Sequence, residues 1–161
     1  MVRVGDRAPE FRLKASTGAE IALADYRGRQ PVLLLFFPLA FSPVCTRELC
    51  SLRDDYARFQ EMGAQVLAVS VDSPFTLAAW AEQMKFPFPL LSDFNKEVAR
   101  RYDALHDDLL GLRGVAKRSA FVIDREGIVR YAWVSDDPRA LPDFDALGRA
   151  LREAGARAAA G

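Results

Sequence analysis

The chain has 161 residues, half of them hydrophobic, which suits one domain over residues 1–161 with a sizeable core. Its formal net charge is zero, so nothing in the composition indicates nucleic-acid binding. No stretch reaches the roughly 20 apolar residues that cross a bilayer, so a membrane protein is not expected.

A short β-hairpin is predicted near the N-terminus, with strands over residues 10–13 and 20–23. The run Val32–Phe37 lies between two prolines and is apolar throughout, which predicts a strand buried on both faces. Apolar residues then recur every three or four positions over residues 43–62. This spacing predicts a helix, which Gly63 ends.

A second buried strand is predicted over residues 65–71. Ser73 and Pro74 then have the chemistry of a helix start, as N-cap and first helical residue of a helix that reaches about Met84. The remaining elements, in chain order, are an extended piece at 90–91, a helix at 97–102, a loop at 103–117, strands at 119–123 and 128–133 around a turn, and a helix at 143–154.

This order of elements predicts an α/β fold. Strand, helix and strand in succession require a parallel crossover, and the later hairpin adds antiparallel strands to the same sheet. A central mixed sheet flanked by helices follows, and it is compatible with a thioredoxin-like fold.

The stretch Ser42-Pro43-Val44-Cys45 directly follows the first buried strand. Ser42 suits the N-cap and Pro43 the first helical position, which places Cys45 in the first turn of the helix. Unpaired N–H groups and the helix dipole stabilise a thiolate there, at the carboxyl end of a strand where α/β sheets usually place their sites. The alternative is that Cys45 is simply a small buried hydrophobic residue.

Cys50 lies five residues after Cys45. On a helix this spacing separates the two residues by roughly 140° and about 7.5 Å along the axis. A disulfide needs Cβ atoms within about 4.5 Å of each other, so the pair cannot bond while the helix is intact. Either Cys50 is a bystander that faces the core, or the first turns unwind when Cys45 is oxidised. The spacing also differs from the C-x-x-C motif of dithiol exchange proteins.

Two cysteines and one histidine are too few to indicate a disulfide framework or a structural metal site, and no cofactor is expected. His106 lies in a charged segment and is expected to be solvated rather than catalytic. The N-terminus lacks the apolar core of a signal peptide, which favours a cytoplasmic protein with reduced thiols.

The stretch PLAFSPVC resembles the active-site motif of the peroxiredoxins, Pro-x-x-x-Thr/Ser-x-x-Cys, with Pro38, Ser42 and Cys45 at its fixed positions. Residues 4–13 resemble the N-terminal hairpin of peroxiredoxin sequences, which precedes the motif. Residues 86–93 and 118–130 resemble two blocks that follow the motif, in the same order as in the family. Within the family, FFPLAFSPVC is most similar to the alkyl hydroperoxide reductase E subgroup. The Cys-x-x-x-x-Cys spacing is instead typical of the bacterioferritin comigratory protein subgroup.

The resemblance implies a role for each motif residue. Cys45 would be the peroxidatic cysteine, and Arg118 would hold its thiolate and the peroxide. Ser42 would contact substrate oxygen, the Pro38 ring would shield the sulfenic acid, and Glu48 would orient Arg118. Cys50 would be the resolving cysteine, if that residue is not a bystander.

The function that the resemblance implies is a thiol-dependent peroxidase for hydrogen peroxide, organic hydroperoxides or peroxynitrite. The reductant would be thioredoxin, a glutaredoxin-like protein or a small thiol, and a homodimer is expected. The alternatives are a thiol–disulfide oxidoreductase and a peroxide-sensing redox switch on the same fold.

Overall fold

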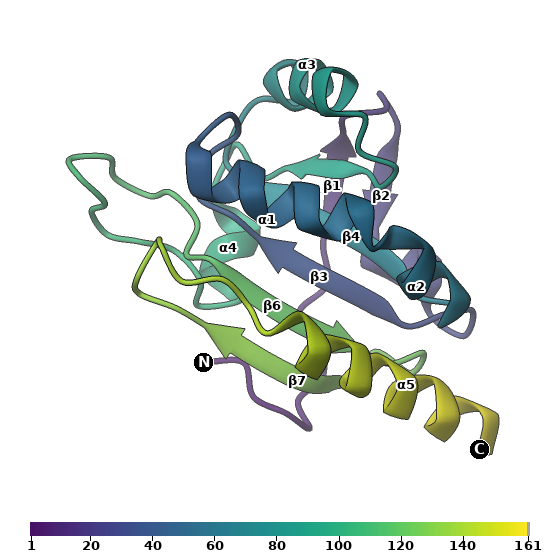
Figure 1. Ribbon diagram of the computed structural model, residues 1–161. Helices are drawn as coiled ribbons and strands as arrows, with labels where there is room; N and C mark the ends of the chain where they lie inside the picture. The colour runs from purple at the N-terminus through teal and green to yellow at the C-terminus, as the bar shows by residue number, and fades with distance from the viewer. Residues whose placement is uncertain (161) are drawn as a thin grey trace.

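The computed structural model describes residues 1–160, and the side chains of residues 1–155, with helices on both faces of a mixed sheet (Figure 1). The strands are β1 (Arg12–Ala15), β2 (Glu20–Ala22), β3 (Val32–Phe36), β4 (Gln65–Ser70), β5 (Leu90–Ser92), β6 (Ser119–Ile123) and β7 (Val129–Val134). The helices are the 3-10 helix η1 (Leu23–Tyr26), α1 (Pro43–Asp54), α2 (Tyr56–Glu61), α3 (Pro74–Met84), α4 (Glu97–Arg101) and α5 (Phe144–Ala160). Within residues 1–160, none of these helices combines the length and the apolar character that a bilayer crossing requires.

The strands follow the order β2-β1-β5-β4-β3-β6-β7 across the sheet. Strands β3, β4 and β5 are parallel, whereas β6 pairs antiparallel with β3 and β7 pairs antiparallel with β6. The N-terminal hairpin of β1 and β2 joins the opposite side of the sheet through an antiparallel pairing of β1 with β5. The predicted mixed sheet, its parallel crossovers and both hairpins are therefore confirmed.

Both faces of β3 are buried, as its apolar run predicts. Leu33 and Leu35 contribute to the core beneath α1, α2, α3 and α5. Leu34 and Phe36 contribute to a second core on the other face, which α4 and η1 cover. The alternation of side chains along a strand explains how one continuous apolar run supplies two cores.

The helix predicted over residues 43–62 is interrupted at Asp55, where α1 ends and α2 begins. Asp55 leaves the helical conformation, with a φ of −104° and a ψ of 11°, and aspartate has a weak intrinsic preference for helix interiors. Asp55 instead pairs with Arg58 in the next turn, with 3.3 Å between Oδ2 and Nη1. The prediction of one continuous helix was therefore wrong at this one residue.

Smaller differences concern the ends of elements. β1 begins at Arg12 rather than residue 10, β7 is displaced by one residue, and η1 was not predicted. Helix α5 extends to Ala160, beyond the predicted end at residue 154. Ser73 is confirmed as the N-cap of α3, where its Oγ accepts a hydrogen bond from the Thr76 N–H at 3.1 Å.

The register of the strands brings three chain segments to one end of the sheet. Phe36, the last residue of β3, pairs with Val69 of β4 and with Ser119, the first residue of β6. The loop after β3, the turn after β4 and the residue before β6 therefore meet at this end. Cys45, Asp72 and Arg118 lie on or close to these segments.

Candidate functional site

Cys45 lies in the first turn of α1, just beyond the carboxyl end of β3. Ser42 occupies the N-cap and Pro43 the first helical position, so both sequence predictions for this helix start are confirmed. The Cys45 side chain is only 1% exposed and belongs to the edge of the core beneath α1. Its position in the first turn places the sulfur beside the positive end of the helix.

The Ser42 hydroxyl does not cap α1, although the residue stands at the cap position. Its Oγ donates to the carbonyl of Leu39 at 2.7 Å, because the loop turns back on itself at Phe41. The Ser42 carbonyl accepts from the Thr46 N–H and hydroxyl instead. With its proton directed to Leu39, the Ser42 oxygen retains lone pairs that can accept a hydrogen bond from a ligand.

Arg118 immediately precedes β6 and is 1% exposed. Its Nη2 donates to the Cys45 sulfur at 3.1 Å, and its Nη1 donates to Oε1 of Glu48 at 2.6 Å. Nε and Nη2 also reach the Pro138 carbonyl, at 3.3 and 3.0 Å. Burial opposes the charged guanidinium, but Glu48 and Cys45 outweigh it and raise the pKa of Arg118. The arginine is therefore a fixed cation beside the sulfur.

Glu48 is fully buried one turn after Cys45 and supports the arginine from the other side. Among the described residues, its Oε2 atom has no hydrogen-bond partner. Burial raises the pKa of Glu48 to about 7, although the charge and hydrogen bond of Arg118 act in the opposite direction. This carboxyl group therefore changes its charge close to neutral pH.

The shifted pKa of Glu48 predicts a pH-dependent loss of stability. The folded state binds the Glu48 proton more tightly than the unfolded state does. Protonated Glu48 therefore adds to the free energy of unfolding, fully below about pH 4.5, and this stabilisation is lost as the pH rises to about 7. Relative to Glu48→Gln, the wild type should lose about 3 kcal/mol of unfolding free energy across this range, at 1.36 kcal/mol per pKa unit. Urea unfolding of both proteins at several pH values measures the difference. Identical pH dependence in the two proteins would contradict it.

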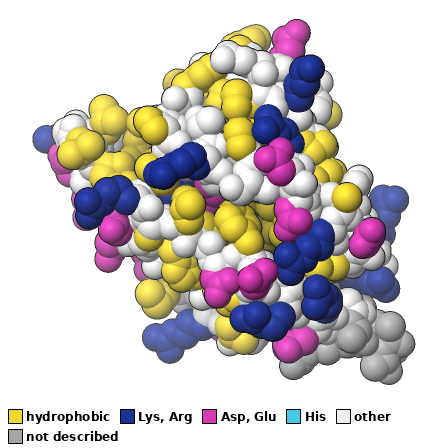
Figure 2. Space-filling view, viewed as in Figure 1, with side chains coloured by type: hydrophobic (Ala, Val, Ile, Leu, Met, Phe, Trp, Pro, Cys, Tyr) yellow, Lys and Arg dark blue, Asp and Glu magenta, His cyan; other side chains and the backbone are white. Residues whose placement is uncertain are grey.

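A cavity of about 210 Å³ opens above Cys45. Besides Ser42 and Arg118 its lining is mostly apolar, and consists of Pro38, Leu39, Pro43, Val44, Leu109, Leu110, Leu112, Pro138 and Arg139. Leu109, Leu110 and Leu112 come from the projecting loop before β6, where Figure 2 shows hydrophobic side chains gathered next to Lys and Arg. Leu110 is 94% exposed and has a φ of 54° at the tip of this loop.

Sequence reasoning did not find the leucines of this loop or Pro138. The prediction that residues 103–117 lack regular secondary structure is confirmed, but nothing in it places their leucines in the lining of the cavity above Cys45. The only signal was the concentration of apolar residues in LeuLeuGlyLeu at 109–112, which is unusual for a solvated loop.

The prediction that His106 is solvated was wrong, because its side chain is only 7% exposed. The loop folds back so that the His106 N–H donates to the Val115 carbonyl, and the Gly114 N–H donates to the His106 carbonyl. Burial lowers the pKa of His106, and the nearby Lys117 lowers it further. His106 does not line the cavity above Cys45.

Both cysteines are free thiols, and both lie in the uninterrupted helix α1. Cys50 is half-buried and packs against the core beneath α1. Its position five residues after Cys45 keeps the predicted angular separation, so a bond between the two sulfurs requires α1 to unwind.

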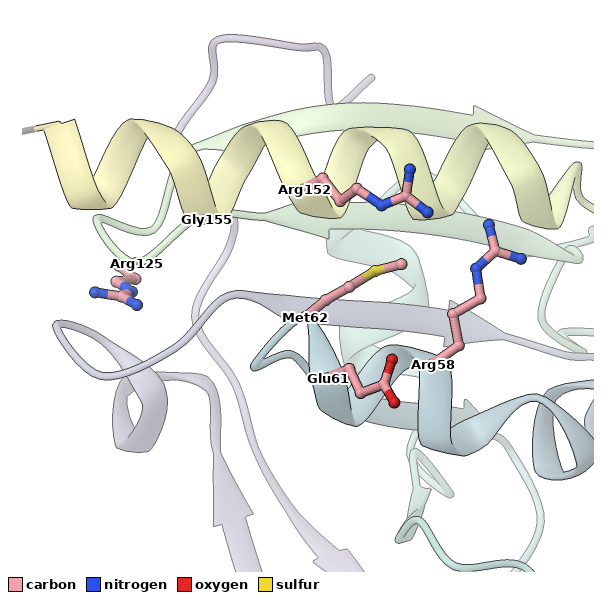
Figure 3. A pocket seen from close by; sticks show the side chains of 6 residues that line it. All are labelled: Arg58, Glu61, Met62, Arg125, Arg152 and Gly155. Carbon is pink, nitrogen blue, oxygen red and sulfur yellow. The ribbon is translucent and has the colours of Figure 1, made fainter.

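A second hollow, of about 460 Å³, lies at the other end of β3, where Val32 pairs with Gln65 and Ile123 (Figure 3). Its lining consists of Arg58, Glu61, Met62, Arg125, Arg152 and Gly155. It contains no cysteine, serine or histidine. Among the described residues, no group of three or more His, Cys, Asp or Glu side chains could hold a metal ion.

Comparison with known proteins identifies several relatives. A family model described as "AhpC/TSA family" matches residues 4–132. The chain is 42% identical over 134 residues to alkyl hydroperoxide reductase E of Mycobacterium tuberculosis, which covers 82% of this chain and 85% of the relative. It is 38% identical over 136 residues to a peroxiredoxin of Thermoplasma volcanium, covering 81% of this chain and 64% of that protein.

Two solved structures are also similar. The peroxidoxin BcpB of Mycobacterium tuberculosis has a TM-score of 0.84 and 33% identity, over 95% of this chain and 98% of that one. The reduced 2-Cys peroxiredoxin of Plasmodium vivax has a TM-score of 0.83 and 31% identity, over 94% and 81% of the two chains. The thioredoxin-like fold predicted from the order of elements is thus confirmed.

Proposed function

The chain belongs to the AhpC/TSA family of peroxiredoxins and is a thiol-dependent peroxidase, and we propose from this premise that Cys45 is its peroxidatic cysteine. The single observation that supports this assignment best is the 3.1 Å contact between Arg118 Nη2 and the Cys45 sulfur. A guanidinium fixed beside the sulfur places hydrogen-bond donors where the sulfur and a bound peroxide meet. Of the two cysteines, only Cys45 lines the cavity.

In the proposed reaction, the Cys45 thiolate attacks one oxygen of the peroxide. A sulfur–oxygen bond forms while the oxygen–oxygen bond breaks, so the sulfur is oxidised to sulfenic acid and the peroxide is reduced. The second oxygen leaves as hydroxide or alkoxide and takes up a proton. Arg118 donates hydrogen bonds to the oxygens as negative charge moves between them, which lowers the barrier.

The other motif residues have supporting roles in this proposal. Ser42 Oγ, with its own proton directed to Leu39, accepts a hydrogen bond from the peroxide O–H. Pro38 forms an apolar wall of the cavity and shields the sulfenic acid from water. Glu48 orients Arg118 through the 2.6 Å contact and is a positioning residue, since it does not line the cavity.

The apolar lining of the cavity supports organic hydroperoxides as substrates beside hydrogen peroxide and peroxynitrite. Leu109, Leu110 and Leu112 offer a surface against which an alkyl group can be removed from water. Thiols return the sulfenic acid to the starting thiol. We propose two routes. In one, Cys50 attacks the Cys45 sulfenic acid after α1 unwinds, which forms an internal disulfide and releases water, and an external thiol then reduces this disulfide. In the other, thioredoxin, a glutaredoxin-like protein or a small thiol attacks the sulfenic acid directly, which releases water and forms a mixed disulfide that a second thiol reduces.

Stopped-flow mixing with hydrogen peroxide tests the assignment. Cys45 should be oxidised orders of magnitude faster than free cysteine, because one preorganised donor alone contributes on the order of 10²–10³ in rate. A rate close to that of free cysteine would contradict the proposal.

The family relationship does not favour either alternative function, a dithiol oxidoreductase or a non-catalytic sensor. The sequence also lacks the C-x-x-C motif that a dithiol oxidoreductase uses.

We also propose that two copies associate through the aromatic residues Phe41, Phe75 and Phe94. All three are exposed, Phe75 by 84%, and they follow β3, β4 and β5 at one end of the sheet. Exposed apolar clusters of this kind are typical of association surfaces.

We further propose that the protein is located in the cytoplasm. Both of its cysteines are free thiols, as is usual in that compartment, and cell fractionation tests the location.

The dimer predicts a strong effect of Phe75→Glu. A charge at a desolvated aromatic position should weaken association by roughly 100-fold, in line with other interface hot spots. Sedimentation equilibrium measures the dimer dissociation constant, and Val4→Glu, at another exposed apolar position, is the control. A wild-type protein that sediments as a monomer at micromolar concentration would contradict the dimer itself.

A further inference from the structure

The loop between β3 and α1 has a strained backbone at Phe41, with a φ of 67°. Bulky residues rarely adopt this left-handed conformation, and it persists only where surrounding contacts hold it. The strained residue lies between Pro38 and Ser42, both of which line the cavity. Whatever holds Phe41 therefore also sets the shape of the peroxide site.

Asp72 supplies such a contact from a different part of the chain. It lies in the turn after β4, and its Oδ2 accepts the N–H of Ala40 at 2.8 Å, one residue before the strained position. The same oxygen accepts the Ser70 hydroxyl at 2.6 Å, and the Asp72 carbonyl accepts the Ser92 hydroxyl at 2.6 Å. Ser70 belongs to β4 and Ser92 to β5, so two strands of the central sheet fix the position of Asp72.

Other contacts within the loop are weaker constraints. The Phe41 ring packs against Trp80 with 5.9 Å between ring centroids, but it remains about half exposed. The Ser42 hydroxyl bonds to Leu39 inside the same loop and does not tie the loop to the sheet. A hydrogen bond to an ionised carboxylate is roughly twice as strong as a neutral one, so the contact to Asp72 is the firmest of the three.

We infer that Asp72 is a positioning residue of the peroxidase site, which holds the Ala40 N–H and thereby aims Ser42 and Pro38 at the peroxide on Cys45. This inference rests on the proposed role of Cys45. None of the hydrogen bonds of Asp72 involves Cys45, Glu48 or Arg118. Its loss should therefore impair the placement of the peroxide and leave the nucleophile intact.

The test compares two reactions of Cys45 in a Cys50→Ser background. Asp72→Ala should lower the rate with hydrogen peroxide by about 10- to 100-fold, because small displacements of positioning groups cost up to about 10² in rate. Alkylation of Cys45 by iodoacetamide, which does not use the peroxide contacts, should change less than about twofold. Asp72→Asn keeps a weaker, uncharged acceptor and should show an intermediate loss of about threefold.

Ser73→Ala is the matched control, since it removes the N-cap bond of α3 at the next residue without reaching the loop. It should lower thermal stability but leave both rates unchanged. A peroxide rate at the wild-type value in folded Asp72→Ala would overturn the inference, as would an equal loss in both reactions. If Asp72→Ala does not fold, Asp72→Asn decides in the same way.

The outcomes separate this inference from the proposed function. If the wild-type protein reacts with peroxide no faster than free cysteine, the proposed role of Cys45 is contradicted, whatever rates the variants show. If the wild type and Asp72→Ala react with peroxide equally fast, and both faster than free cysteine, only the inferred role of Asp72 is contradicted.

Discussion

Replacement of Cys45 by serine is expected to abolish peroxide reduction. A serine hydroxyl beside Arg118 is not ionised near neutral pH and cannot form the sulfenic acid, so no slower version of the same chemistry remains. Serine is nearly isosteric, and the contacts of Arg118 with Glu48 and Pro138 do not depend on the sulfur. The variant should therefore fold normally. Peroxide consumption with an excess of thiol reductant measures the loss.

The matched variant Cys50→Ser separates the two cysteines. It should keep the fast first oxidation, because Cys50 does not line the cavity. If Cys50 resolves Cys45, mass spectrometry of the oxidised wild type should show the internal disulfide, and Cys50→Ser should lose turnover with thioredoxin. A stable sulfenic acid in the wild type and unchanged turnover in the variant would assign resolution to an external thiol. Normal first-step oxidation of Cys45→Ser would contradict the whole assignment.

Replacement of Arg118 by methionine is expected to slow the reaction of Cys45 with peroxide by roughly 10²–10³-fold, the usual cost of losing a preorganised donor. The substitution removes the cation 3.1 Å from the sulfur and leaves Glu48 buried without its partner. Arg118 acts to lower the pKa of Glu48, so without it the buried carboxyl takes up a proton and becomes a polar group without its partner. Such a group costs roughly 1–3 kcal/mol, so the single variant should also be less stable. Stopped-flow oxidation and urea unfolding measure the two effects.

The double variant Arg118→Met with Glu48→Leu distinguishes catalysis from stability. It replaces both partners of the buried pair by apolar side chains and should recover much of the lost stability while the rate stays low. Arg118→Lys should also react slowly, because one ammonium group cannot reach Cys45, Glu48 and the Pro138 carbonyl together as the guanidinium does. Recovery of the rate together with stability would show that Arg118 acts only on folding.

Local features of the chain were sufficient to predict the start of the site. The apolar run from Val32 followed by Ser42, Pro43 and Cys45 predicts a buried strand, a helix start and a cysteine in the first turn, and all three are observed. These features depend on backbone and side-chain preferences within a few residues, which the sequence displays directly. The resemblance to peroxiredoxins added Arg118 and Glu48, which no local pattern singled out.

Other parts of the molecule depend on contacts between distant segments. The group formed by Cys45, Glu48 and Arg118 arises because β6 pairs beside β3, which joins positions about 70 residues apart. The leucines over the cavity, the burial of His106 and the contact of Asp72 with Ala40 have the same origin. The sequence by itself thus determined the strand, the helix start and the place of Cys45, the proposed nucleophile, in the first turn. Only the tertiary structure decided what surrounds the sulfur, because strand pairing and loop packing are set by the free energy of the whole fold rather than by neighbouring residues.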